Sequence, residues 1–191
     1  MNAGFDTFVR SEQLADSWLW ERITVDLGYW VQSRKLQAAL VEFQEWIKRI
    51  EKSTGVDLPQ YCGYSPLNRK LTVFAGFDTD YASVPRIFWK LFDRKEIRRA
   101  AILHDALYRL LRWLWKQGLL SRSQRRLYRK LADDIFLEAM PYSVPPVPGW
   151  KIAAAYRSVR MFGWIGWSSN KKPINPPRPQ RGPKHRTSRR R

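Results

Sequence analysis

The chain is poor in the residue types that build most disulfide scaffolds and zinc domains. Its 191 residues include one cysteine, Cys62, and two histidines. A single cysteine cannot form a disulfide within the chain, and a zinc site built mainly from thiolates needs more of them. These shortages exclude a disulfide-stapled scaffold and a cysteine-rich zinc domain, and they favour an intracellular or redox-indifferent setting.

Long apolar runs are missing as well. The most apolar stretches, 103–115 and 161–167, are short or interrupted by arginine, and a helix needs about 20 apolar residues to cross a bilayer. The first 13 residues lack the basic-then-apolar pattern of an export signal. We therefore expect neither a transmembrane segment nor a signal peptide.

Acidic residues are scarce relative to basic ones. Lysine and arginine number 35 against 17 aspartate and glutamate, for a formal net charge of +18. This balance suits DNA or another polyanion, or a peripheral contact with an anionic membrane. Residues 171–191 hold nine basic residues, five prolines and no acid, so we expect a disordered basic tail.

Apolar residues are abundant enough to build a core. They make up 44% of the chain and include ten tryptophans, so most of the chain should fold. We predict a mainly helical α+β fold with a small sheet near residues 22–31 and 71–77. The expected divisions are an N-terminal segment (1–32), an amphipathic helix (33–55), a domain (56–170) and the tail (171–191).

Helix signals are strongest at four places. Ser33 can cap a helix that carries apolar residues on one face and ends near Gly55. We expect it to pack on the body, with a membrane-lying helix as the alternative. Helices over about 96–117 and from Ser121 or Ser123 to about 140 should form an antiparallel hairpin, and a last helix should cover about 150–161.

The hairpin carries the best candidates for catalysis. His104 lies in the middle of an apolar face, with Tyr108 one turn later. Burial favours the neutral imidazole, which can accept a proton. Asp133 lies among apolar residues of the second helix, where a carboxylate needs a cation, a metal or a histidine. We predict a catalytic group of His104, Tyr108 and Asp133, with a hydrogen-bonded core histidine as the alternative.

Carboxylates of the segment 76–83 suggest a cation site. Asp78 and Asp80 lie two residues apart, and oxygen ligands suit hard cations. With Asp105 facing this loop, they would hold calcium or another divalent cation. The alternative is a structural loop, in which Asp and Ser serve as turn and cap residues. Ser83 has the right chemistry for a nucleophile, but a helix cap is the preferred interpretation.

Basic residues of the first hairpin helix suggest a second kind of site. Four of them fall on one side of the helix, a stripe suited to phosphates. Together with the end of the tail they form the predicted nucleic-acid contacts: Arg98, Arg109, Arg112, Lys116, Arg189, Arg190 and Arg191. A solvated basic face is the alternative interpretation.

Four ordered blocks resemble a known family. They are residues 75–86 (AGFDTDYASVPR), 104–108 (HDALY), 132–140 (ADDIFLEAM) and 156–163 (YRSVRMFG). This pattern resembles the domain-of-unknown-function family 1353 of phages and prophages. The resemblance implies a phage protein. We expect a virion or packaging component that binds DNA, located in the host cytoplasm during infection or in the virion, with other phage structural proteins as partners.

The hairpin residues also resemble a class of enzymes. His-Asp-x-x-Tyr on one helix and an Asp near a Phe on the next is similar to secreted and parvoviral phospholipases A2. The resemblance implies His104 as the base for a water, Asp105 as a calcium ligand and Asp133 as the orienting carboxylate, with Tyr108 supporting the network. The Gly-rich calcium loop of those enzymes has no match here, so Asp78 and Asp80 would replace it. The alternative hypothesis is therefore a metal-assisted hydrolase acting on lipid or cell wall of the host envelope.

Overall fold

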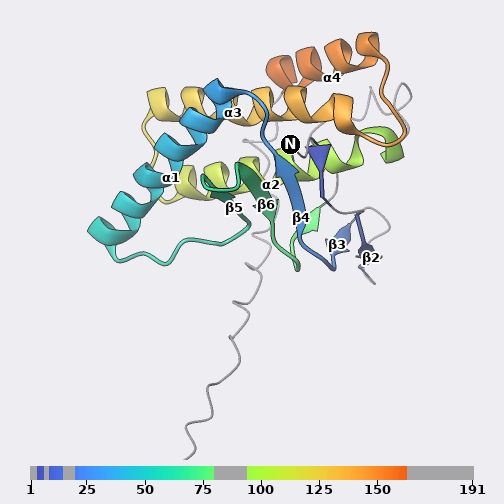
Figure 1. Cartoon of the computed structure of the whole chain (residues 1–191). Helices are drawn as coiled ribbons and strands as arrows, with labels where there is room; N and C mark the ends of the chain where they lie inside the picture. Colours follow the sequence, from blue (N-terminus) through green and yellow to red (C-terminus); the bar gives the residue numbers. More distant parts are fainter. Residues whose placement is uncertain (1–3, 7–8, 15–19, 80–93, 163–191) are drawn as a thin grey trace, which may run out of the picture.

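The chain has an α+β fold in the computed structural model, which describes residues 4–6, 9–14, 20–79 and 94–162 (Figure 1). Along the described residues, four strands precede the first helix, three strands follow it, and the remaining elements are helices. Asp80, the helix cap predicted at Ser83 and the basic tail lie outside the described residues. Within the described residues, no helix combines the length and the apolar character needed to cross a membrane.

The larger sheet has four antiparallel strands in the order β1-β4-β6-β5. Their bounds are Gly4–Phe5 for β1, Leu27–Trp30 for β4, Cys62–Ser65 for β5 and Lys70–Val73 for β6. Leu71 of β6 lies opposite Tyr29 of β4 and Tyr64 of β5. Leu71 and Val73 are buried and alternate with half-buried neighbours, so one face of β6 belongs to the core.

A second sheet corrects the strand predicted for residues 71–77. That strand ends at Val73, and the chain turns at Gly76, whose φ of 87° glycine adopts without strain. The chain then enters β7 (Asp78–Thr79), which pairs with β3 (Glu21–Ile23), and β3 pairs with β2 (Ser11–Gln13). Asp78 and Thr79 are therefore strand residues, although the sequence predicted a loop there.

The first helix, α1 (Arg34–Thr54), lies between the two residues predicted to limit it. The Ser33 side chain accepts a hydrogen bond from the backbone N–H of Leu36, and Gly55 ends the helix with a φ of 65°. Leu40 and Phe43 are buried, and the helix contacts α3 and β5. The helix therefore packs on the body of the protein.

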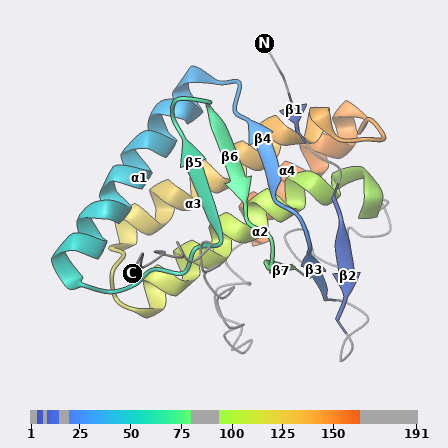
Figure 2. The same ribbon diagram turned by 60° about the horizontal axis from the view of Figure 1, so that its bottom comes forward.

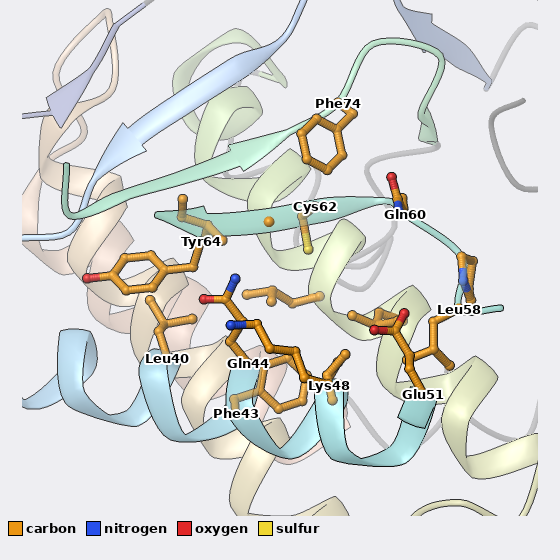
Figure 3. Close-up of a pocket in the computed structure, with 16 residues that line it drawn as sticks. Leu40, Phe43, Gln44, Lys48, Glu51, Leu58, Gln60, Cys62, Tyr64 and Phe74 are labelled. Carbon is orange, nitrogen blue, oxygen red and sulfur yellow. The ribbon is translucent and has the colours of Figure 1, made fainter. Parts of the chain in front are cut away.

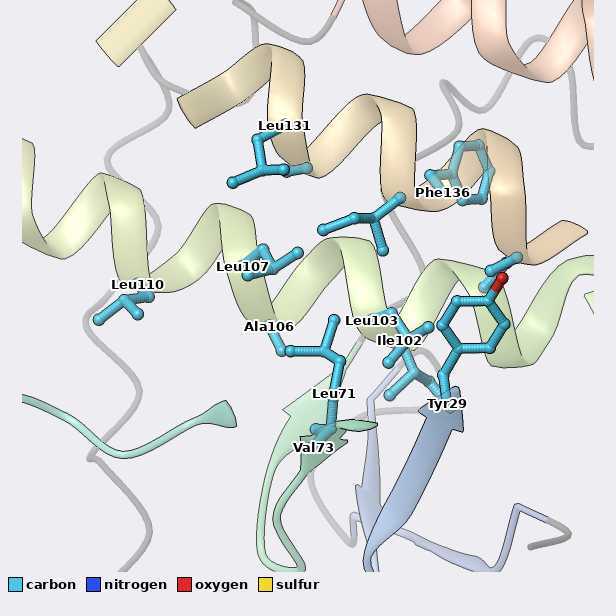
Figure 4. Packing of buried hydrophobic residues seen from close by; sticks show 14 of the residues in the cluster. Tyr29, Leu71, Val73, Ile102, Leu103, Ala106, Leu107, Leu110, Leu131 and Phe136 are labelled. Carbon is cyan, nitrogen blue, oxygen red and sulfur yellow. The ribbon is translucent and has the colours of Figure 1, made fainter. Parts of the chain in front are cut away.

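The second helix, α2 (Arg94–Lys116), runs through the middle of the molecule (Figure 2). His104 lies on an apolar face, as the sequence predicted, and residues on a further side of the helix are buried as well. His104 and Leu111 are buried. Leu103, Leu107 and Leu110, which lie roughly 60° to 120° around the helix from His104, are buried too. Figure 4 shows these leucines between α3 and the strands that carry Leu71 and Val73.

The last helices form the outer layer over α2. The helix α3 (Arg122–Ala139) begins after Ser121, and Ser121 and Gln124 cap each other in both directions. This cap decides between the two serines that the sequence offered. The 3-10 helix η2 (Met140–Tyr142) leads to α4 (Gly149–Phe162), which packs on α3 (Figure 1).

Candidate functional site

A buried histidine and a buried aspartate meet between α2 and α3. The Nε2 atom of His104 lies 2.8 Å from Oδ1 of Asp133, and the two side chains are 1% and 0% exposed. A neutral imidazole can form this bond only as a donor, because an ionised carboxylate only accepts. The contact therefore favours the tautomer with its proton on Nε2 and a lone pair on Nδ1.

Two further side chains hold Asp133. The Tyr108 hydroxyl donates to Oδ1 at 2.7 Å, and Arg160 of α4 donates from Nη1 to Oδ2 at 2.8 Å. Burial opposes ionisation of Asp133, but the hydrogen bonds from His104, Tyr108 and Arg160 outweigh it and lower the carboxyl pKa. Burial, followed by the charge of Asp133, raises the pKa of Tyr108. Asp133 is thus held as a carboxylate, and Tyr108 as a neutral donor.

The second ring nitrogen of His104 is exceptional. Nδ1 is buried and makes no hydrogen bond with any described residue, whereas buried polar atoms normally have a partner. The ring itself is fixed by packing, with the rings of Tyr108 and Phe136 centred 4.0 and 5.2 Å away. His104 therefore presents an oriented lone pair that the described protein does not use.

The predicted cation ligands face different partners. Asp78 accepts two hydrogen bonds from Arg22, at 2.7 and 3.1 Å, across the β3–β7 pair. Asp105 accepts from the Thr79 hydroxyl at 2.6 Å. Among the described residues, no three His, Cys, Asp or Glu side chains gather into a metal site. Asp80 lies outside the described residues.

The predicted basic stripe of α2 is not uniform. Arg98 forms an ion pair with Glu21. The Arg109 guanidinium lies over the rings of Phe77 and Trp20, at 4.7 and 5.3 Å, with Nη1 buried and without a described hydrogen-bond partner. Arg112 is half-buried, and Lys116 is exposed. Arg189, Arg190 and Arg191 lie outside the described residues.

A separate pocket of about 310 Å³ lies between α1 and β5. Its apolar lining includes Phe43, Phe74 and Leu107, and Lys48 lines it too (Figure 3). Cys62 also lines it, and burial raises the pKa of this thiol to about 12. His104 is not among the lining residues, so the pocket and the histidine site are distinct features.

Sequence reasoning missed the contribution of α4. Arg160 bonds Asp133, and the Tyr156 hydroxyl donates to Oδ1 of Asp134 at 2.8 Å. Both residues occur in the last of the four sequence blocks, and both aspartates occur in the third. The spacing of Tyr156 and Arg160 was the available signal, because side chains four residues apart lie on the same side of a helix and can contact the same neighbouring helix. The blocks are joined in space by these two contacts.

Comparison with protein-family models matches residues 57–159 to DUF1353, described as a protein of unknown function. The match covers α2 and α3 whole and most of α4, and the chain belongs to this family. No curated protein and no solved structure matches the chain.

Proposed function

We propose that the site centred on His104 and Asp133 is catalytic and that His104 acts as a general base toward water in ester hydrolysis. The unpartnered, buried Nδ1 atom carries this proposal. A histidine with a purely structural role usually has both ring nitrogens bonded. Here Nε2 is bonded, and Nδ1 has no hydrogen-bond partner among the described residues.

The side chains support a complete proton cycle. The lone pair of Nδ1 takes a proton from a water molecule, whose oxygen bonds to the carbonyl carbon of an ester. Asp133 stabilises the resulting imidazolium, and Arg160 and Tyr108 keep Asp133 ionised and in place. When the carbon–oxygen bond to the leaving alcohol breaks, the imidazolium returns the proton to that oxygen. The products are a carboxylic acid and an alcohol.

The helix arrangement supports this assignment too. Tyr108 follows His104 by one turn, and Arg129, one turn before Asp133, lies 3.5 Å from the Tyr108 hydroxyl. These contacts link α2 and α3 on both sides of the Tyr108 ring. The similarity to phospholipases A2 favours lipid esters of the host envelope over cell-wall bonds as the substrate, with calcium or another divalent cation as an expected cofactor.

Hydrolysis assays on the full chain test the proposal. The substrates are phospholipid vesicles, scored by fatty acid release, and peptidoglycan sacculi, scored by released fragments. We expect His104→Gln to lower the rate at least 100-fold. His185→Gln changes the only other histidine and should leave the rate unchanged. Equal rates for wild type and His104→Gln on a substrate that is turned over would overturn the proposal.

DNA binding is the second candidate function, in a virion or packaging component. Basic side chains exposed around the turn between α2 and α3 favour it: Lys116, Arg122 and Arg126. Such charges release counterions from DNA, roughly 0.9 for each contact. A phage origin, a place in the host cytoplasm or virion, and contacts with other phage structural proteins stay predictions.

The salt dependence of DNA binding tests this candidate. In the full chain, Lys116→Gln with Arg122→Gln should reduce the slope of log affinity against log salt by roughly 2. The matched control is Lys48→Gln with Arg49→Gln, which removes two exposed charges from α1. Binding that is insensitive to salt, or equal loss in both variants, would contradict a DNA contact at this turn.

A further inference from the structure

The outer face of α4 carries an unusual combination of side chains. Trp150 and Met161 are 61% and 63% exposed. At 100° per residue they lie within about 20° of each other and roughly 16 Å apart along the helix. Ala153 and Arg157 fall on the same side and are exposed. We call Trp150, Ala153, Arg157 and Met161 the α4 outer stripe.

The opposite side of α4 accounts for why the stripe faces outward. Ala155 and Val159 are 0% exposed and lie against the protein. Figure 1 shows α4 on the outer side of α3, away from the strands. Two large apolar side chains of the stripe, Trp150 and Met161, therefore face solvent over most of their surface.

Charge identifies the kind of surface that the stripe fits. The helix contains Lys151, Arg157 and Arg160 and has no acidic residue. The Lys151 ammonium lies 5.9 Å from the centre of the Trp150 ring, so a cation and an exposed indole stand together. Basic groups beside tryptophan and methionine match a lipid surface, with headgroup phosphates above an apolar layer. DNA offers phosphates but no apolar phase for Trp150 and Met161.

We propose that the α4 outer stripe docks the protein on an anionic membrane surface. Trp150 and Met161 enter the boundary between headgroups and acyl chains, and Lys151 and Arg157 contact lipid phosphates. Arg160, on the flank of the stripe, bonds Asp133 and so links the docked helix to the histidine site. The docking does not depend on the proposed hydrolysis.

Cosedimentation with vesicles tests the docking surface. The probe is phosphatidylcholine with one-third phosphatidylglycerol, compared with phosphatidylcholine alone. We expect the wild-type protein to bind the anionic vesicles more strongly than the neutral ones. The double variant Trp150→Ser with Met161→Ser should lower the partition coefficient at least tenfold, because burial of one large apolar side chain in the membrane contributes roughly that factor. Arg157→Gln should lower binding to the anionic vesicles and leave binding to phosphatidylcholine vesicles unchanged.

Leu67→Ser with Leu127→Ser is the matched control, because these leucines are 91% and 59% exposed on other elements. This control should bind as wild type does, and so should His104→Gln, which separates docking from catalysis. Unchanged binding by the Trp150 and Met161 variant would overturn the proposal. If Arg157→Gln alone weakens binding, the contact is a general polyanion contact of the kind DNA makes, and the proposal fails.

Discussion

Arg160 on α4 donates a hydrogen bond to the aspartate that faces His104 on α2. The Nη1 atom of Arg160 lies 2.8 Å from Oδ2 of Asp133, whereas His104 contacts Oδ1. The two oxygens of one carboxylate thus join three helices, because Asp133 belongs to α3. The histidine site is therefore sensitive to how α4 is seated.

Replacing Arg160 tests that link. Arg160→Gln should lower the free energy of unfolding by about 1 kcal/mol, since a hydrogen bond to a charged group is lost from a partly exposed site. Arg157→Gln on the exposed stripe should change it by less than about 0.5 kcal/mol. Urea denaturation of both variants measures the difference, and equal values would show that Arg160 does not anchor α4.

Substitution of the two adjacent aspartates, Asp133 and Asp134, should lower the stability of the protein by different amounts. Asp133→Asn removes a buried carboxylate from His104, Tyr108 and Arg160, and we expect a loss of about 3 kcal/mol in the free energy of unfolding. Asp134→Asn affects a more exposed side chain bonded to Tyr156 and Lys130, with an expected loss of about 1 kcal/mol. A larger loss for Asp134→Asn in thermal or urea unfolding would contradict this ranking.

Low pH should remove part of the contribution that Asp133 makes to the free energy of unfolding. Its pKa is lower in the folded protein, so its stabilisation is complete above the pKa of the unfolded chain, about 3.9, and is lost as the pH falls toward the folded value. The stability difference between wild type and Asp133→Asn should therefore shrink from pH 5 to pH 2. Urea midpoints along this range measure it, and a constant difference would exclude a lowered pKa.

Cys62 should react slowly with iodoacetamide. A pKa of about 12 leaves much less thiolate at pH 8 than an ordinary cysteine has. We expect a rate at least 100-fold below that of a cysteine placed at the exposed Leu67 in a Cys62→Ala background, and a rate that rises up to about pH 12. Equal rates at pH 8 would show that the pocket does not shelter the thiol.

Local signals predicted the helices well. Ser33, Gly55, Ser121 and Gly118 mark helix ends through side-chain caps or positive φ, and such features depend on neighbours in the chain. The α+β class could be predicted because it too depends on local sequence patterns. By contrast, β1, β2 and β5 are two to four residues long and carry too few positions for an alternating pattern to show.

Long-range pairings were beyond the sequence. Asp78 faces Arg22 because β3 and β7 pair in register, although 56 residues separate the two. Periodicity placed Asp133 and His104 on apolar faces but gave no role to Arg160, because nothing local shows that α4 returns to α3. The second buried face of α2 was missed because a helical wheel does not report how many layers surround a helix.

The protonation of His104 is the most direct test of the account. The full chain with His185→Gln contains a single histidine, so ¹⁵N labelling of histidine gives the signals of one imidazole by NMR. In the neutral imidazole we predict a proton on Nε2, toward Asp133, and a lone pair on Nδ1. Asp133→Asn in the same background should disturb this tautomer. A proton on Nδ1 in the His185→Gln protein would contradict the account, because the nitrogen proposed to accept a proton from water would then carry no lone pair.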